Sequence, residues 1–120
     1  MSVADTVNAY LEALARHDLD AVVALYAEDA TIEDPVGSPK VTGHDAIRAF
    51  YGKALPGITG ARLLGQVRSV ANEVAFPFEI SMSFNGHDMV MDIIDIFVLN
   101  EEGRVVAMRA FWSEANMRPA

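Results

Sequence analysis

The chain has 120 residues, of which 52% are hydrophobic, and its formal net charge is −8. This length allows one domain with a real core and is too short for two, so we predict a single domain over residues 1–120. The acidic balance argues against nucleic acid or an anionic membrane as a partner, because both attract basic surfaces. The sequence has no cysteine, which excludes disulfides and thiolate chemistry. Since neither a secretory signal nor a membrane span is recognisable, we expect a cytoplasmic protein.

The first part of the chain has helical periodicity. Ser2 with Asp5 resembles a capping box at the start of a first helix that ends near His17. Its apolar face is formed by Val3, Val7, Tyr10 and Leu14. Asp18 can cap a second helix, whose apolar face is predicted to include Tyr26. Tyr10 and Tyr26 are therefore both expected to point inward from helices.

A third helix is predicted after a short extended segment and a loop. Residues 31–34 read as extended, and residues 35–39 are a loop by composition. Thr42 with Asp45 then opens the helix. Its apolar side is formed by Ile47, Phe50, Tyr51 and Ala54.

Beyond Pro56-Gly57 the apolar period changes from helical to two, which is typical of strands. Strands are predicted over residues 63–68, 75–84, 89–99 and 104–113. Asn85-Gly86 is a strong signal for a hairpin turn. Helices followed by a run of antiparallel strands indicate an α+β domain, in which a curved sheet wraps over the helices and leaves room for a pocket.

One acid, Asp95, interrupts an apolar row on one face of a predicted strand. The other members of the row are Met89, Met91, Ile93, Phe97 and Leu99. Desolvation disfavours a charge in such a place, so we expect Asp95 to keep its proton at neutral pH and to donate a hydrogen bond. The residues leave an alternative open, in which Asp95 is a buried acid paired with an arginine such as Arg109.

Asp34 is the second candidate acid. Pro35 biases its backbone toward extended geometry, and Ile32 points to the same side. A carboxylate fixed at the rim of an apolar pocket suits a general base that takes a proton from a carbon beside a carbonyl. The alternative is an ordinary turn aspartate before a proline, which the pattern alone favours.

The aromatic residues permit two interpretations. Core packing explains the ring of each tyrosine, but a buried phenol also needs a hydrogen-bond partner. Tyr10, Tyr26 and Tyr51 could therefore form a chain of hydroxyls that ends at a ligand oxygen. A substrate-binding wall is predicted to include Phe78, Phe84, Met108 and Trp112, although core is the usual place for such residues.

The sequence predicts neither a cofactor nor a metal. The three histidines, His17, His44 and His87, lie at predicted helix ends or beside a turn, outside the apolar stripes. No group of His, Asp and Glu has metal-ligand spacing, and no glycine-rich phosphate loop is present.

Several segments taken together resemble the bacterial Δ5-3-ketosteroid isomerase family. They are Tyr10-Leu11-Glu12, residues 25–35, Ala49-Phe50-Tyr51, residues 92–95 and residues 111–114. The similarity runs from about Thr6 to Met117. It implies a cone-shaped α+β domain with a cystatin-like or nuclear-transport-factor-like fold, in which three N-terminal helices pack in a strongly curved, mainly antiparallel sheet. It also implies a homodimer.

The resemblance further implies an activity, the isomerisation of neutral 3-oxo-Δ5-steroids to conjugated 3-oxo-Δ4-steroids. Asp34 matches the base that moves a proton from C4 to C6. Tyr10 and protonated Asp95 match the two donors to the dienolate oxygen, which form an oxyanion hole. Tyr26 and Tyr51 match hydroxyls that support Tyr10.

Other functions of the same fold stay open at this point, because a fold does not fix a reaction. An epoxide hydrolase would need an Asp-Arg-Asp arrangement, for which Arg109 is the evident strand arginine. A non-catalytic steroid- or lipid-binding module would use the acid only as a specificity contact. Dehydratases that depend on histidine are disfavoured, because no histidine is expected in the core.

Overall fold

The computed structural model describes residues 2–120. Its helices are α1 (Val3–Arg16), α2 (Leu19–Ala24) and α3 (His44–Ala54), with short 3₁₀ turns η1 (Leu55–Gly57) and η2 (Glu114–Asn116). Its strands are β1 (Tyr26–Glu33), β2 (Val41–Thr42), β3 (Ile58–Leu63), β4 (Arg68–Val70), β5 (Glu73–Phe84), β6 (His87–Leu99), β7 (Val105–Phe111) and β8 (Met117–Pro119). Within residues 2–120, no helix is both long and apolar enough to cross a membrane.

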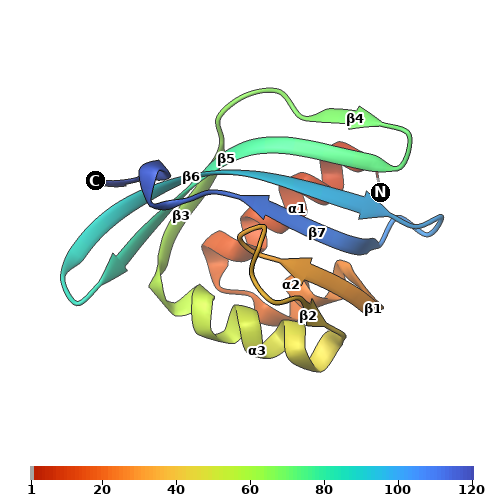
Figure 1. The fold of residues 1–120 in the computed structure, drawn as a ribbon, viewed down its shortest axis with the longest axis horizontal. Helices are drawn as coiled ribbons and strands as arrows, with labels where there is room; N and C mark the ends of the chain where they lie inside the picture. Colours follow the sequence, from red (N-terminus) through yellow and green to blue (C-terminus); the bar gives the residue numbers. More distant parts are fainter. Residues whose placement is uncertain (1) are drawn as a thin grey trace.

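The helices gather on one side of a large curved sheet, as Figure 1 shows. The strand order is β2-β1-β7-β6-β5-β3, with β4 added to β5 and β8 added to β6. β1 and β7 run parallel, and the other described strand pairs are antiparallel. The core lies between the helices and the sheet and includes Val22, Ile32, Ile47, Phe76 and Phe97. The predicted α+β domain with a mainly antiparallel sheet is confirmed.

The first helix forms as its sequence predicts. The backbone N–H of Asp5 donates to Ser2 Oγ and that of Ser2 donates to Asp5 Oδ2, each over 3.1 Å. This reciprocal pair satisfies donors that a helix start otherwise leaves free. The helix ends at His17, which takes a left-handed conformation with φ 58°. The stripe predicted to face inward is buried at Val7, Tyr10 and Leu14.

The prediction that Tyr26 lies on the second helix is wrong. α2 ends at Ala24, and Tyr26 is the first residue of β1, paired with Val105 of β7. The backbone N–H of Val105 donates to the Leu25 carbonyl over 2.9 Å. Pairing with the distant strand β7 overrides the helical pattern, because it provides hydrogen-bond partners for the backbone that follows α2. Tyr26 is nevertheless fully buried, as predicted.

Two other boundaries also differ from the prediction because of strand pairing. Thr42 does not cap the third helix: it pairs with Thr31 in a short ladder, and Gly43 stands at the N-cap without a side-chain hydrogen bond. The strand predicted at 63–68 instead occupies 58–63, because residues 58–63 pair with β5.

A long hairpin of β5 and β6 forms the centre of the sheet. Asn85 and Gly86 both have positive φ, 51° and 80°, between the paired residues Phe84 and His87. Positive φ at both central positions matches the twist of the flanking strands, so the predicted hairpin turn is confirmed. Near the middle of β6, Asp95 is opposite Phe76 on one side and Ala110 on the other. Its backbone is therefore fixed by strands on both edges.

Candidate active site

A cavity of about 250 Å³ lies between the helices and the sheet. Its wall consists of Tyr10, Leu14, Asp34, Phe50, Tyr51, Ala54, Ile58, Phe78, Ile80, Met82, Phe84, Met91, Ile93, Asp95 and Trp112. Small-molecule sites usually have volumes of about 300–1,000 Å³, so this hollow suits a ligand that it encloses in part. Its walls are mostly apolar, and the few polar groups are those that the sequence pointed to.

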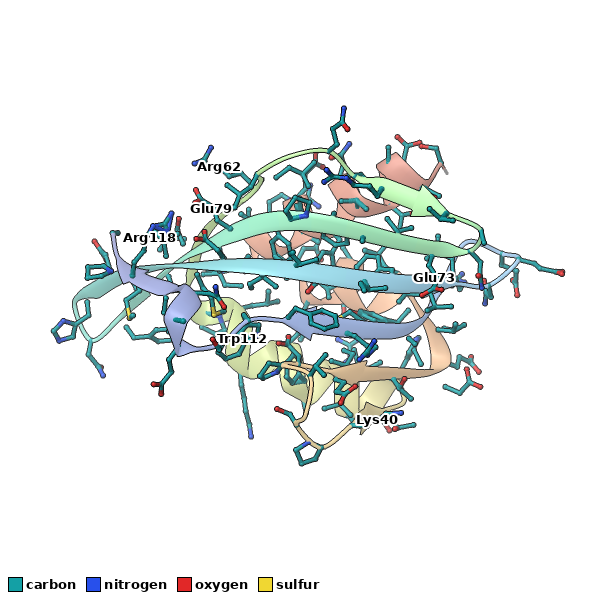
Figure 2. All side chains as sticks on the ribbon, turned by 45° about the horizontal axis from the view of Figure 1, so that its top comes forward. Lys40, Arg62, Glu73, Glu79, Trp112 and Arg118 are labelled. Atoms are coloured by element: carbon teal, nitrogen blue, oxygen red, sulfur yellow. The ribbon has the colours of Figure 1, made fainter. Side chains whose placement is uncertain are left out.

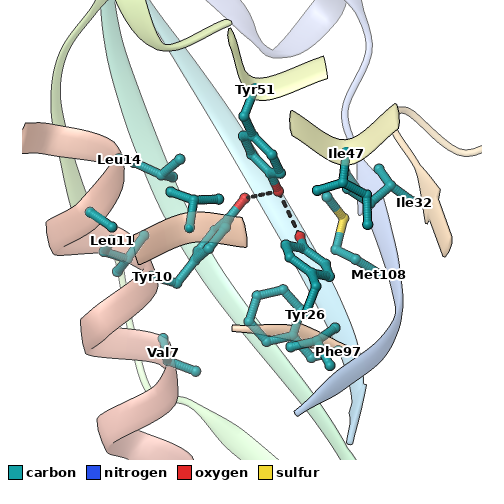
Figure 3. Packing of buried hydrophobic residues seen from close by; sticks show 14 of the residues in the cluster. Val7, Tyr10, Leu11, Leu14, Tyr26, Ile32, Ile47, Tyr51, Phe97 and Met108 are labelled. Atoms are coloured by element: carbon teal, nitrogen blue, oxygen red, sulfur yellow. Dashed lines mark hydrogen bonds between the residues drawn. The ribbon is translucent and has the colours of Figure 1, made fainter. Parts of the chain in front are cut away.

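Three tyrosine hydroxyls form a continuous chain inside the core (Figure 3). The hydroxyls of Tyr10 and Tyr51 are 2.9 Å apart, and those of Tyr51 and Tyr26 are 2.6 Å apart. The three side chains come from α1, α3 and β1 and are all buried. Burial raises the pKa of each phenol well above its ordinary value, so all three keep their protons. The predicted chain therefore exists, with one member on a strand.

Asp95 is buried on the same cavity wall and is only 1% exposed. Neither of its carboxyl oxygens has a hydrogen-bond partner among the described residues. Burial raises the pKa of Asp95 well above its ordinary value, the nearby charge of Asp34 raises it further, and the neighbouring Tyr10 hydroxyl acts against this rise. A buried polar group without a partner is rare in a folded protein, and here the carboxyl borders a space that a ligand can fill.

Asp34 lies where β1 ends, in a less enclosed position. It follows Glu33, and its peptide bond to Pro35 is cis. The indole Nε1–H of Trp112 donates to Asp34 Oδ1 over 2.6 Å; Figure 2 shows Trp112 just beyond β7. Burial raises the pKa of Asp34, and the indole hydrogen bond acts against this rise. The hydrogen bond stabilises the ionised form and also fixes the direction of the carboxylate.

The strand order fixes how the two acids are spaced. In the sheet β7 lies between β1 and β6, and Ala110 of β7 is paired with Asp95. Glu33, which precedes Asp34, is paired with Arg109, and the backbone N–H of Val36 donates to the Ala110 carbonyl over 2.9 Å. Asp34 and Asp95 are therefore two strand spacings apart, or roughly 10 Å between backbones. A flat ligand has room to touch both.

The predicted wall is only partly right. Phe78, Phe84 and Trp112 line the cavity, but Met108 does not. Met108 is 1% exposed and packs in the core near Ile32 and Ile47, as Figure 3 shows. Wall residues that the prediction missed include Ile80, Met91 and Ile93. Each lies an even number of positions from Phe78 or Asp95 on the same strand and therefore on the same face, so strand alternation could have identified it.

The alternative that pairs Asp95 with Arg109 is wrong. Arg109 Nε lies 3.6 Å from Glu33 Oε1, and its guanidinium lies 5.1 Å from the centre of the Phe111 ring. Since Arg109 is exposed while the neighbouring Ala110 is buried, its side chain lies on the opposite face of β7 from the cavity. The Asp-Arg-Asp arrangement considered for an epoxide hydrolase therefore has no arginine in the cavity wall.

The described residues offer no grouping that resembles a metal site. Across residues 2–120, no three His, Cys, Asp or Glu side chains come together where they could hold an ion. His17, His44 and His87 are absent from the cavity wall. The polar groups available to a ligand in the cavity are thus carboxyls, phenols and the indole.

The fold and the cavity define an α+β domain whose concave sheet face encloses a small, largely apolar site with two carboxyls. The chain belongs to the SnoaL-like domain family, whose model matches residues 7–108. The protein named Steroid Delta-isomerase from Nocardioides simplex is 41% identical to this chain over 111 residues, which are 92% of this chain and 89% of the relative. The resemblance noted in the sequence is thus confirmed.

A solved structure shares the fold closely. It is described as that of SalBIII, an epoxide hydrolase/cyclase-like enzyme in pyran ring formation in the polyether salinomycin. The TM-score is 0.90 with 27% sequence identity, and the match covers 98% of this chain and 95% of that chain. The same architecture therefore occurs in proteins described with different chemistry, and the reaction must be argued from the side chains in the cavity.

Proposed function

We propose that this protein isomerises 3-oxo-Δ5-steroids to conjugated 3-oxo-Δ4-steroids, with a neutral ketosteroid held in the cavity. The relative that is 41% identical over 92% of the chain supports this activity. The observation that carries the proposal is the unpartnered carboxyl of Asp95, which lines the cavity together with the hydroxyl-bearing Tyr10 and the second acid, Asp34. These groups match the needs of a reaction that moves a proton while negative charge develops on a ketone oxygen.

Asp34 acts as the base in this proposal. Its ionised carboxylate takes a proton from C4 of the steroid, and the electron pair of that C–H bond moves toward O3 to give a dienolate. The protonated carboxyl then returns the same proton to C6, so the double bond moves into conjugation and no atom is gained or lost. The hydrogen bond from Trp112 supports this role, because it favours the charged form and holds the carboxylate in one direction.

Tyr10 and Asp95 act as the two donors to O3, forming an oxyanion hole. The two hydroxyl–hydroxyl contacts in the tyrosine chain use two of the three phenolic protons. If Tyr26 donates to Tyr51 and Tyr51 donates to Tyr10, the remaining proton is that of Tyr10, which lines the cavity. The opposite direction would leave the proton at Tyr26, which is 0% exposed and outside the cavity wall. Tyr26 and Tyr51 thus direct the Tyr10 proton to the ligand.

The apolar wall increases the effect of these donors. A hydrogen bond in a site without water is stronger than the same bond in solvent, and fixed donors need little reorganisation as charge develops. Protonated Asp95 donates to the oxyanion and brings no negative charge beside it. An ionised Asp95 would instead repel the dienolate.

A homodimer and a cytoplasmic location also remain proposals. Apolar side chains on the outer face of the sheet support the dimer: Ile94 and Phe111 are paired neighbours on β6 and β7 and are 48% and 39% exposed. Exposed apolar residues that lie side by side are typical of surfaces that meet a partner.

The molar mass in solution tests the dimer, and a monomer at micromolar concentration contradicts it. Fractionation of the source cell tests the location.

The activity is tested by replacing the base. The wild-type protein is expected to convert a neutral 3-oxo-Δ5-steroid to the conjugated enone, followed by its ultraviolet absorbance. Asp34→Asn should lower the rate by at least about 10²-fold, because it removes the proton acceptor. Glu33→Gln is the matched control, since Glu33 precedes Asp34 but contacts Arg109 and the Gly37 backbone.

Binding distinguishes an enzyme from a binding module. Asp34→Asn should still bind a phenolic steroid, because Tyr10 and Asp95 remain. Tight steroid binding by the wild-type protein without any product would identify a non-catalytic binding module. Unchanged turnover in Asp34→Asn would remove Asp34 from the reaction.

A further inference from the structure

A second hollow adjoins the cavity. It has a volume of about 620 Å³ and is lined by residues of β2 and α3, and its lining includes Lys40, Thr42 and Lys53. Phe50 and Ala54 of α3 line both this groove and the cavity. The two spaces therefore share part of their lining at Phe50 and Ala54 of α3.

The groove concentrates positive charge on an acidic protein. Lys40 and Lys53 are the only lysines of the sequence, whose formal net charge is −8. Both are exposed, and Figure 2 shows Lys40 at the outer edge of the molecule. In the described part of the chain, neither lysine forms an ion pair. The nearby acid Glu33 is engaged by Arg109 and by the backbone N–H of Gly37.

We propose that this lysine groove binds an anionic side chain carried by the steroid at the end opposite to O3. The inference rests on the proposed function, which directs the ketone oxygen to Tyr10 and Asp95. With O3 there, the rigid rings fill the cavity of about 250 Å³, and the far end of the molecule continues past Phe50 and Ala54. A substituent at C17 that ends in a carboxylate then reaches the two ammonium groups.

The chemistry of lysine fits such a tail. Its ammonium group stands on a flexible apolar stem, so it can follow side chains of different length while the stem packs on apolar surface. The groove between the lysines is lined by small or apolar residues such as Val41, Ala46 and Ala49. These residues suit the hydrocarbon part of the tail, while the ammonium groups suit its charged end.

The test compares two probes that differ by one charge. They are a 3-oxo-Δ4-steroid whose C17 side chain ends in a carboxylate, and the methyl ester of the same compound. The wild-type protein should bind the acid about three- to tenfold more tightly than the ester at low salt, because an exposed ion pair contributes a few-fold in affinity for each lysine. The preference should shrink as the salt concentration rises.

Variants locate the source of the preference. The double variant Lys40→Met/Lys53→Met keeps the apolar stems and should bind acid and ester equally. Lys40→Arg/Lys53→Arg should retain the preference. Arg68→Met removes one charge from β4, outside the groove, and should behave as the wild-type protein does. Equal binding of both probes by the wild-type protein, or a preference that persists in the methionine variant, overturns the inference.

The outcome is separable from that of the proposed function. Turnover of a neutral 3-oxo-Δ5-steroid without a side chain does not involve the lysines, so it should be unchanged in the methionine variant. If that neutral steroid is isomerised and the charged probe has no advantage, only the lysine groove fails. If no steroid is isomerised, the proposed function fails, whatever the two probes show.

Discussion

The two ends of the cavity place the same kind of side chain in opposite surroundings. Asp95 lies in the middle of the sheet, 1% exposed and without a hydrogen-bond partner among the described residues. Asp34 lies at the end of a strand, half-buried, with an indole N–H donating to its carboxylate. Burial raises the pKa of both acids; the indole of Trp112 acts against the rise at Asp34, and the nearby hydroxyl of Tyr10 acts against the larger rise at Asp95.

This difference in surroundings supports the proposed division of roles between the two acids. A carboxyl that keeps its proton can donate a hydrogen bond to a developing oxyanion, and a carboxylate that is ionised can accept a proton from carbon. The surroundings raise both pKa values, but only that of Asp95 is raised well above its ordinary value, so Asp34 loses its proton at a lower pH than Asp95 does. Substitutions at or beside either acid can therefore test whether the two carboxyls have different roles.

Among the changes that follow, removal of the buried acid Asp95 should have the largest effect on turnover. Asp95→Leu replaces a donor with an apolar side chain of similar size and should lower kcat about 10²- to 10³-fold, the usual cost of losing one donor to an oxyanion. Asp95→Asn keeps an N–H donor, so its kcat should fall less than that of Asp95→Leu. Both are measured by steady-state turnover, and a leucine variant as active as the wild-type protein would show that the proton of Asp95 is not used.

The pH dependence of stability tests whether Asp95 keeps its proton in the folded protein. The folded protein holds the proton of Asp95 to higher pH than the unfolded chain does, because the folded pKa is raised above the ordinary value of 3.8. The free energy of unfolding should therefore fall as the pH rises above about 4. Asp95→Leu should weaken this fall, as measured by chemical denaturation at several pH values.

The tyrosine chain should give the next largest effect, mainly on stability. Tyr51→Phe removes both hydroxyl contacts and leaves the hydroxyls of Tyr10 and Tyr26 buried without their partner. Each buried group left unsatisfied costs about 1–3 kcal/mol, so the free energy of unfolding should fall by at least about this amount. Tyr26→Phe is the matched control: it removes one contact, at the end away from the cavity, and should cost less. Equal losses would contradict a chain that is linked through Tyr51.

A change beside the half-buried acid Asp34 should have the smallest effect on turnover, and that effect should appear mainly in the pH dependence of kcat/KM. Trp112→Phe removes the hydrogen bond that holds the pKa of Asp34 down, so that pKa should rise. Since the ionised carboxylate is the active base, activity is lost as the pH falls through the pKa of Asp34. The acidic limb of the kcat/KM profile should therefore move to higher pH, with only a small change on the plateau. Movement of that limb to lower pH contradicts the assigned role of the indole.

Local patterns predicted the features that depend on neighbours in the sequence. The capping box at Ser2, the hairpin at Asn85-Gly86 and the apolar row around Asp95 all formed as expected. In each case the decisive contacts span only a few residues, or the alternation within one strand decides which face is buried. The burial of the three tyrosines was predictable for the same reason.

Features that depend on distant pairing were not predictable from one sequence. The helical pattern before Tyr26 predicts a helix there, whereas the structure pairs Tyr26 with Val105, which lies far along the chain. The hydrogen bond between Trp112 and Asp34 joins residues that are 78 positions apart, and no local signal indicates it. Met108 was placed in the wall because strand alternation does not reveal which side chains a helix covers.

The central position of β7 has a consequence for how such a site can change. Because Ala110 lies between the two acids, the spacing of the strands largely sets their separation, and Asp34 stands directly after the last residue of β1. Loops elsewhere in the chain can lengthen or shorten without altering the distance between the proposed base and the proposed hydrogen-bond donor. A new substrate is therefore more readily accommodated by changes in the apolar cavity wall than by a change in the positions of the two acids.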